Sequence, residues 1–172
     1  MRLGIWTMLK KRRSHRLQNF DYSSANSYFI TICVLNMECK LGTIKNGIMG
    51  FSETGNASCI LLQEICEARK NVILDEFIIM PNHIHAIIDI NNGKYNPENI
   101  NKFSRPVPNS VSMIINHFKG SVKKWCINHH LHFEWQGRYH DHIIRNREEY
   151  WAIKNYIIQN PRKWQMDKFY QL

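Results

Sequence analysis

The middle of the chain carries two apolar runs rich in β-branched residues, at residues 72–79 and 83–90, joined by the tripeptide Met-Pro-Asn. Proline has a fixed φ and no N–H group, so it fits a turn better than a position inside a strand. Strands joined by so short a turn pair as antiparallel neighbours. The sequence therefore predicts a central β-hairpin, around which the other elements have to be arranged.

The segments on either side of this hairpin show strand and helix signals. Asn46-Gly47 between short apolar runs is typical of a type I′ hairpin turn. Ser110 suits a helix N-cap, and Asn146 followed by Glu149 resembles a capping box. In chain order we expect a strand at residues 28–34, a hairpin at 41–49, a helix at 57–70, the central hairpin, a helix after Ser110, a strand within 133–144 and a final helix that stops at Pro161.

Without the early hairpin and the final helix, this order of elements is strand, helix, strand, strand, helix, strand. It is the order of the ferredoxin-like split βαβ arrangement. We therefore predict an α+β fold: a ferredoxin-like (split βαβ) antiparallel sheet with helices on one face, plus an N-terminal hairpin and a C-terminal helix that carries Tyr156. Many functions share that fold, so the fold alone predicts none of them.

The length of 172 residues, with 44% hydrophobic residues, fits one domain with a substantial core. The run KKRRSHR near the start is too charged to pack. We expect residues 1–19 to form a basic, mobile arm ahead of a single domain at residues 20–172. Arg12 and Arg13 in this arm either contact phosphates or only keep the chain soluble.

The 23 Lys and Arg residues outnumber the 14 Asp and Glu residues, which gives a formal net charge of +9 at pH 7. This excess favours an extended anionic partner, either nucleic acid or a membrane surface. No apolar run approaches the ~20 residues that span a bilayer, and we expect no membrane partner. Five cysteines without a CxxC pair, and no apolar leader, argue against a secreted disulfide framework and predict a cytoplasmic protein.

His83-Ile84-His85 is the sharpest chemical feature of the sequence. Side chains alternate along a strand, so the two histidines project from one face and could chelate one divalent ion. Ile84 then points to the opposite face and into the core. The alternative is a pair of hydrogen-bonded histidines on a half-exposed strand.

Tyr156 and Asn160 are four residues apart on the predicted final helix. Residues with this spacing lie on one helix face, so a phenol and an amide oxygen would point in the same direction. The alternative is that Tyr156 only packs with Ile153 and Ile157.

Three strings together resemble a known family: MPNHIHAIIDI, NSVSMIINHFKGSVKKW and WQGRYHDHIIRNREEYWAIKNYIIQNPRKW. They are similar, in the same order, to the single-tyrosine transposases of the HUH (His-hydrophobic-His) endonuclease superfamily. The resemblance is strongest to the branch associated with repetitive extragenic palindromes, followed by the small insertion-sequence transposases. It runs from about Tyr28 to Trp164.

The resemblance implies a metal-dependent single-stranded DNA endonuclease with strand-transfer activity. Such an enzyme cuts beside a recognised DNA hairpin, which is a palindromic repeat or a transposon end. At the matching positions the resemblance makes Tyr156 the nucleophile that forms a 5′-phosphotyrosine intermediate. It makes His83, His85 and Asn160 the ligands of Mg²⁺ or Mn²⁺, with Asn160 standing where the small insertion-sequence enzymes have Gln.

DNA binding also needs cations near the phosphates, and the sequence offers three groups of candidates. They are Arg12 and Arg13 in the arm, Lys119, Lys123 and Lys124 on the polar face of the helix after Ser110, and Arg138 and Arg145 ahead of the tyrosine helix. A protein of this kind would be associated with the nucleoid when bound to DNA.

Two other functions stay open on the sequence. A relaxase or replication-initiator nuclease shares the histidine pair and the tyrosine, although it usually has a longer chain with added domains. A catalytically inactive, domesticated DNA-binding module would keep the fold and the basic surface without turnover. Whether the protein is a monomer or a homodimer, and whether Tyr156 acts with the histidines of its own chain, also stay open.

Overall fold

A computed structural model describes residues 25–91 and 110–170 of the chain. The predictions for Arg12, Arg13 and the basic arm at residues 1–19 lie outside the described residues. The division of the chain into residues 1–19 and 20–172 therefore stays a prediction.

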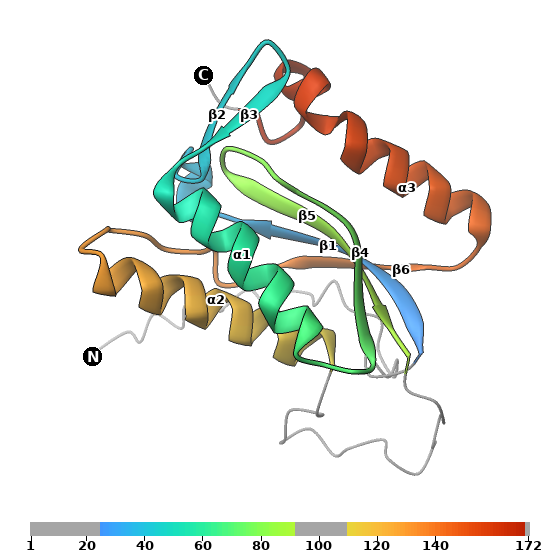
Figure 1. The fold of residues 1–172 in the computed structure, drawn as a ribbon. Coiled ribbons are helices and arrows are strands. Elements are labelled where there is room, and N and C mark those ends of the chain that lie inside the picture. The colour runs from blue at the N-terminus through green and yellow to red at the C-terminus, as the bar shows by residue number, and fades with distance from the viewer. Residues whose placement is uncertain (1–24, 92–109, 171–172) are drawn as a thin grey trace, which may run out of the picture.

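Four antiparallel strands form the main sheet, in the order β4-β5-β1-β6 (Figure 1). The strands are β1 (Asn26–Cys33), β4 (Val72–Ile79), β5 (His83–Ile90) and β6 (His140–Ile144). The predicted central hairpin is confirmed as β4 and β5, and the first strand pairs with β5 along its whole length. Together with the helix connections, this strand order is the predicted ferredoxin-like arrangement.

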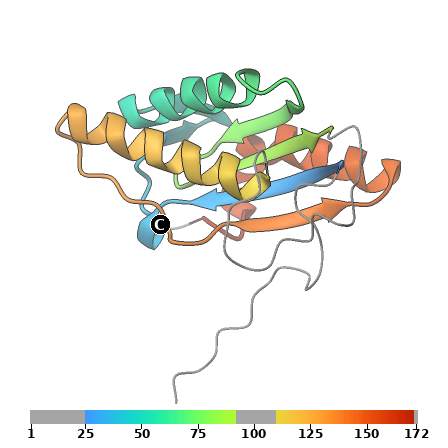
Figure 2. The same cartoon turned by 90° about the horizontal axis from the view of Figure 1, so that it is seen from below.

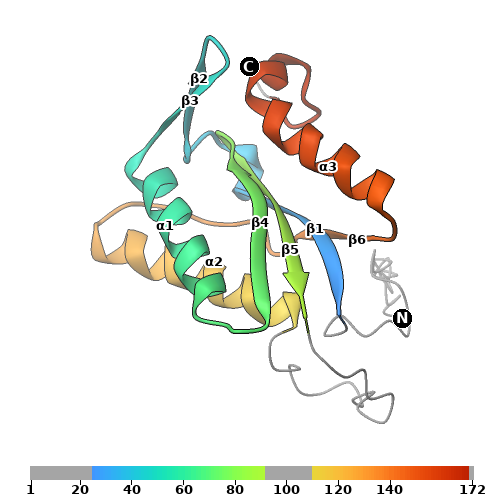
Figure 3. The ribbon, with the colours of Figure 1, turned by 45° about the vertical axis from the view of Figure 1, so that its right-hand side comes forward.

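Helices α1 (Glu53–Glu67) and α2 (Val111–Asn128) lie side by side over one face of the sheet (Figure 2). Helix α3 (Arg147–Gln159) covers the other face (Figure 3). Two apolar cores result. The larger lies between the sheet and α1 and α2, and the smaller contains Ile87, Ile144 and Ile157 under α3.

Side chains cap the helices at their N-termini. Ser110 Oγ accepts a hydrogen bond from the Met113 N–H, and Asn146 Oδ1 accepts one from the Glu149 N–H at 2.8 Å, as predicted for both. The helix predicted at residues 57–70 is confirmed as α1, but Ser52 caps it, so it begins earlier, at Glu53, and it ends earlier, at Glu67.

A second, two-stranded sheet is formed by β2 (Gly42–Lys45) and β3 (Ile48–Phe51). Asn46 and Gly47 at its turn have φ values of 52° and 73°, the positive angles of a type I′ turn, which confirms the predicted hairpin. The tip of this hairpin lies against Arg162. The hairpin thus meets the segment that follows α3.

The strand predicted within residues 133–144 is shorter than expected, since only His140–Ile144 pairs continuously with β1. Trp135 makes an isolated bridge with Val34, and its ring packs against Phe118 and Phe133 in the larger core. Burial of these aromatic rings thus replaces strand pairing here. In the described parts of the chain, no helix is both long and apolar enough to cross a membrane.

Candidate active site

Strand β5 places His83 and His85 on the face of the sheet that α3 covers. Alternation along the strand sends Ile84 and Ala86 into the core under α1 and α2 and the two histidines to the opposite side. Both histidines are buried, with 0% and 1% of their surface exposed, and their ring centroids are 4.5 Å apart. The two imidazoles therefore share one face at contact distance.

Helix α3 brings Tyr156 to these histidines. Ile157, the next residue, is fully buried against the sheet and sets the rotation of the helix. The Tyr156 hydroxyl lies 3.2 Å from His85 Nε2 of the same chain, while 40% of the tyrosine remains exposed. Tyr156 is thus at the edge of the site and not packed in the core.

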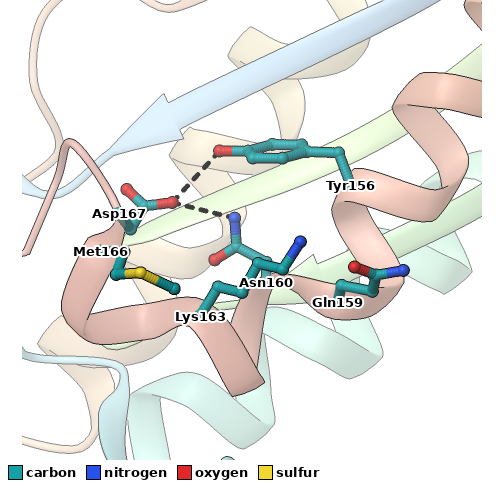
Figure 4. Close-up of a pocket in the computed structure, with 6 residues that line it drawn as sticks. All are labelled: Tyr156, Gln159, Asn160, Lys163, Met166 and Asp167. Carbon is teal, nitrogen blue, oxygen red and sulfur yellow. Dashed lines mark hydrogen bonds between the residues drawn. The ribbon is translucent and has the colours of Figure 1, made fainter.

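After α3, the chain turns through the 3₁₀ helix η3 (Asn160–Met166) and brings Asp167 back to Tyr156 (Figure 4). Asp167 Oδ2 accepts hydrogen bonds from the Tyr156 hydroxyl at 3.1 Å and from Asn160 Nδ2 at 2.9 Å. These residues line a pocket of about 120 Å³ together with Gln159, Lys163 and Met166.

Asp167 is a site residue that no pattern in the sequence predicted. It lies beyond the end of α3, where helical spacing no longer relates it to Tyr156. The available signal was composition: Asp167 is the only Asp or Glu after Glu149, in a basic stretch of the chain. A lone carboxylate in such a stretch is a candidate for a specific role.

The donor atoms at this site fit a divalent metal ion. Ligand atoms of His83, His85 and Asp167 lie within 4.8 Å of one another. Among the described residues, His83 Nε2 and Asn160 Oδ1 are buried without a hydrogen-bond partner. Two imidazole nitrogens with amide and carboxylate oxygens suit Mn²⁺ or Mg²⁺. The predicted ligand set of His83, His85 and Asn160 stays a prediction, to which this geometry adds Asp167.

Burial sets the ionisation of the histidines. It lowers the pKa of His83 to about 3, with a smaller contribution from the charge of Lys168. Burial, and then the neighbouring His83, lower the pKa of His85 well below its ordinary value. Both imidazoles are therefore neutral at neutral pH, which is the form that binds metals.

The phenol of Tyr156 is shifted in the opposite sense. Burial raises its pKa to about 12, and the charge of Asp167 and its hydrogen bond add to the shift. The tyrosine is therefore protonated at neutral pH. A positive charge close to its oxygen would have to offset this shift before the phenol could act as a nucleophile.

The cations predicted to bind DNA lie in different parts of the structure. Lys119 donates to the carbonyls of Gln136 and Gly137, and Lys123 forms an ion pair with Glu134 at 2.6 Å. Lys124 is exposed on the same helix α2, across the sheet from α3. Arg138 and Arg145 are exposed near the two ends of β6. Their contacts with DNA stay predictions, as do those of Arg12 and Arg13.

The fold is similar to that of a solved REP-associated tyrosine transposase bound to a REP hairpin. That structure is 18% identical to this chain and covers 91% of it, the chain covers 77% of the solved protein, and the TM-score is 0.64. A second solved structure, of a proposed transposase from Deinococcus radiodurans, is 13% identical and has a TM-score of 0.47. The match covers 86% of this chain and 98% of the Deinococcus chain. The first of these two structures shows that the molecule shares the fold of the REP-associated tyrosine transposase.

Sequence similarity places the chain in a family. A protein of Haemophilus influenzae (strain Rd), described as uncharacterized, is 38% identical over 167 residues, which cover 92% of this chain and 93% of that protein. The chain belongs to the same family as this Haemophilus protein. No protein-family model matches the chain.

Proposed function

We propose that this protein is a metal-dependent endonuclease and strand transferase of the transposase type, which acts on single-stranded DNA with Tyr156 as its nucleophile. The observation that carries the proposal is the 3.2 Å separation between the Tyr156 hydroxyl and His85 Nε2. A solvent-accessible tyrosine beside two buried, neutral histidines is the arrangement that such a reaction needs. Since all these groups come from one chain, the proposed reaction uses Tyr156 in cis.

The residues divide the chemical work. His83, His85, Asn160 and Asp167 would hold Mg²⁺ or Mn²⁺, and the bound ion would polarise an oxygen of the scissile phosphate. Tyr156 Oη forms the new bond to phosphorus as the bond from phosphorus to the 3′ oxygen breaks. Asp167 Oδ2, at 3.1 Å, is placed to accept the phenolic proton, and the 3′ oxygen leaves as a hydroxyl with a proton from solvent.

The product would be a 5′-phosphotyrosine and a free 3′-hydroxyl. This linkage keeps the energy of the phosphodiester, so attack by another 3′-hydroxyl on the phosphotyrosine would rejoin strands. Cleavage and strand transfer are then one reaction run in two directions.

The proposed substrate is a DNA hairpin with a single-stranded flank. The fold neighbour was solved bound to a REP hairpin, and this chain carries a formal net charge of +9. Tyr156 is 40% exposed and lies over a central strand of the sheet, a position that suits a flexible single strand better than a paired duplex. Exposed cations such as Arg138, Arg145 and Lys124 are proposed contacts to its phosphates.

The test compares the wild type with Tyr156→Phe on labelled single-stranded hairpins that include the flanking repeats of the gene, in Mn²⁺ or in EDTA. A denaturing gel reports covalent protein–DNA adducts. We expect an adduct with the wild type in Mn²⁺ only, and a loss of at least about 10³-fold in Tyr156→Phe, because no other group replaces the nucleophile.

Tyr150→Phe is the matched control. Tyr150 lies on the same helix, and its hydroxyl donates to Asp75 at 2.6 Å, on β4. This variant should form the adduct as the wild type does. Tight binding without an adduct on every flank-derived hairpin would instead favour the DNA-binding module, and an adduct that survives in Tyr156→Phe would exclude Tyr156 as nucleophile.

A further inference from the structure

Asn82 precedes the histidine pair and is fully buried at the start of β5. Its side-chain amide contacts three separate parts of the chain. Nδ2 donates to the carbonyl of Met37 at 3.0 Å and to the carbonyl of Phe169 at 2.8 Å. Oδ1 lies 2.8 Å from His83 Nδ1.

These contacts determine which nitrogen of His83 carries the hydrogen. Carbonyl oxygens only accept hydrogen bonds, so the amide nitrogen of Asn82 has to face Met37 and Phe169. The amide oxygen, which also only accepts, then faces His83 Nδ1. A neutral His83 must therefore carry its hydrogen on Nδ1, which leaves the lone pair of Nε2 free.

The free nitrogen, Nε2, is the one that remains available to a metal ion. Within the described part of the chain, His83 Nε2 is buried and has no hydrogen-bond partner. A buried acceptor without a partner is costly unless a cation or a donor satisfies it. The tautomer set by Asn82 is thus the one that a metal ligand requires.

The side-chain amide of Asn82 also contacts the C-terminal segment that carries Asp167. The Phe169 N–H donates to Asp167 Oδ1 at 2.7 Å, and the Phe169 ring centroid lies 4.6 Å from that of His83. By binding the Phe169 carbonyl, Asn82 ties the segment that carries Asp167 to the strand that carries the histidines.

The second histidine has different partners. Thr31 Oγ1 lies 2.9 Å from His85 Nδ1, and a hydroxyl can either donate or accept. Thr31 therefore orients His85 without itself selecting the tautomer, and the backbone of Ile30 also forms a hydrogen bond with this imidazole. This difference gives a matched comparison between the two neighbours of the histidine pair.

We propose that Asn82 is a positioning residue that selects the Nδ1–H tautomer of His83 and holds Asp167 beside it. The inference rests on the proposed function for its purpose, because the arrangement serves a metal ion in that reaction. Its structural content, a defined tautomer and a tied C-terminal segment, exists without metal or DNA.

The test is ¹H–¹⁵N NMR of the histidine side chains in the full-length, metal-free protein, which distinguishes the two neutral tautomers. In the wild type, His83 should show hydrogen on Nδ1 only. Asn82→Ala should mix the tautomers, and Thr31→Val should leave the His83 pattern unchanged. Circular dichroism confirms that each variant is folded.

Asn82→Asp separates the two roles of the amide. Its carboxylate still accepts from His83 Nδ1, so the tautomer should be kept. It has no N–H groups for Met37 and Phe169, so the Phe169 amide should exchange its hydrogen faster than in the wild type. Mn²⁺ affinity, measured by EPR, should fall about 10- to 100-fold in Asn82→Ala, as for other partners of metal ligands.

A wild-type His83 with hydrogen on Nε2 would overturn the inference without any variant. So would an Asn82→Ala protein that keeps the Nδ1–H tautomer and binds Mn²⁺ as tightly as the wild type does. Neither result depends on DNA cleavage. A Tyr156 adduct with the wrong tautomer would refute the role of Asn82 alone, and the right tautomer without any adduct would refute the proposed function alone.

Discussion

The two faces of the main sheet differ in what their side chains do. On the face under α1 and α2, side chains such as Ile30, Ile84 and Phe118 are fully buried and form one continuous apolar core. On the face under α3, a small apolar cluster lies beside two buried histidines and several polar contacts. The apolar core under α1 and α2 contributes most of the folding stability. The face under α3 can therefore hold polar groups that stabilise the fold poorly.

The largest effect on stability is expected from the α1 and α2 face. Phe118→Ala should lower the free energy of unfolding by about 3–5 kcal/mol, because it removes a fully buried ring that packs on Trp135. Urea denaturation measures the change. Adduct formation by the folded fraction should stay near the wild-type level, and a loss of activity as large as that of Tyr156→Phe would contradict the division between the faces.

The histidine face should instead make stability depend on pH. In the metal-free protein, burial keeps His83 neutral down to a pH of about 3, whereas the unfolded chain takes up this proton near its ordinary pKa of 6.5. The unfolded state then binds more protons, so the stability present above pH 6.5 is lost as the pH falls toward 3. The expected slope is about 1.4 kcal/mol per pH unit for each such histidine.

Urea titrations in EDTA at pH values of about 7 and 5 measure this slope. His83→Leu provides the comparison, because it removes one of the two shifted groups and should flatten the dependence. A slope that is the same in this variant and in the wild type would show that other groups cause the acid sensitivity.

Asp167→Asn should lower Mn²⁺ affinity and the rate of adduct formation by about 10- to 100-fold. The amide keeps the size of the side chain but loses the negative charge that a metal ion attracts. The pKa of Tyr156, which burial and then Asp167 raise to about 12, should fall in this variant. Ultraviolet absorbance of the phenolate measures that pKa, and an unchanged value would remove Asp167 from the site.

The parts of this site that the sequence predicted depend on local rules. The shared face of His83 and His85 follows from strand alternation, and the shared face of Tyr156 and Asn160 follows from helix periodicity. The start of α1 was missed although Ser52 is a local cap, because Gly55 in the first turn weakens the helical pattern. In the fold, Gly55 is needed for packing, since a Cβ there would lie 1.9 Å from the Leu41 carbonyl oxygen.

Asp167 and Asn82 could not be predicted in the same way. Asp167 reaches Tyr156 only because η3 turns the chain back after Pro161. Asn82 contacts Met37, 45 residues away, and Phe169, 87 residues away. No spacing in the sequence relates such residues, so their roles follow from the closure of the fold and not from a motif.

The smallest effect is expected from single cations, and it tests which face the DNA strand follows. Lys163 is exposed beside the pocket that contains Tyr156, whereas Lys124 is exposed on α2, across the sheet. If the scissile strand reaches Tyr156, Lys163→Ala should weaken binding of a single-stranded flank by about 2- to 5-fold. The slope of log affinity against log salt concentration should become smaller by about one, because one phosphate contact is lost. Lys124→Ala should leave the affinity for the flank unchanged and alter only the affinity for the hairpin part.

Fluorescence anisotropy with the two DNA parts, measured over a series of salt concentrations, separates these cases. Equal losses for both variants on the flank would place it around the sheet edge and not along the α3 face.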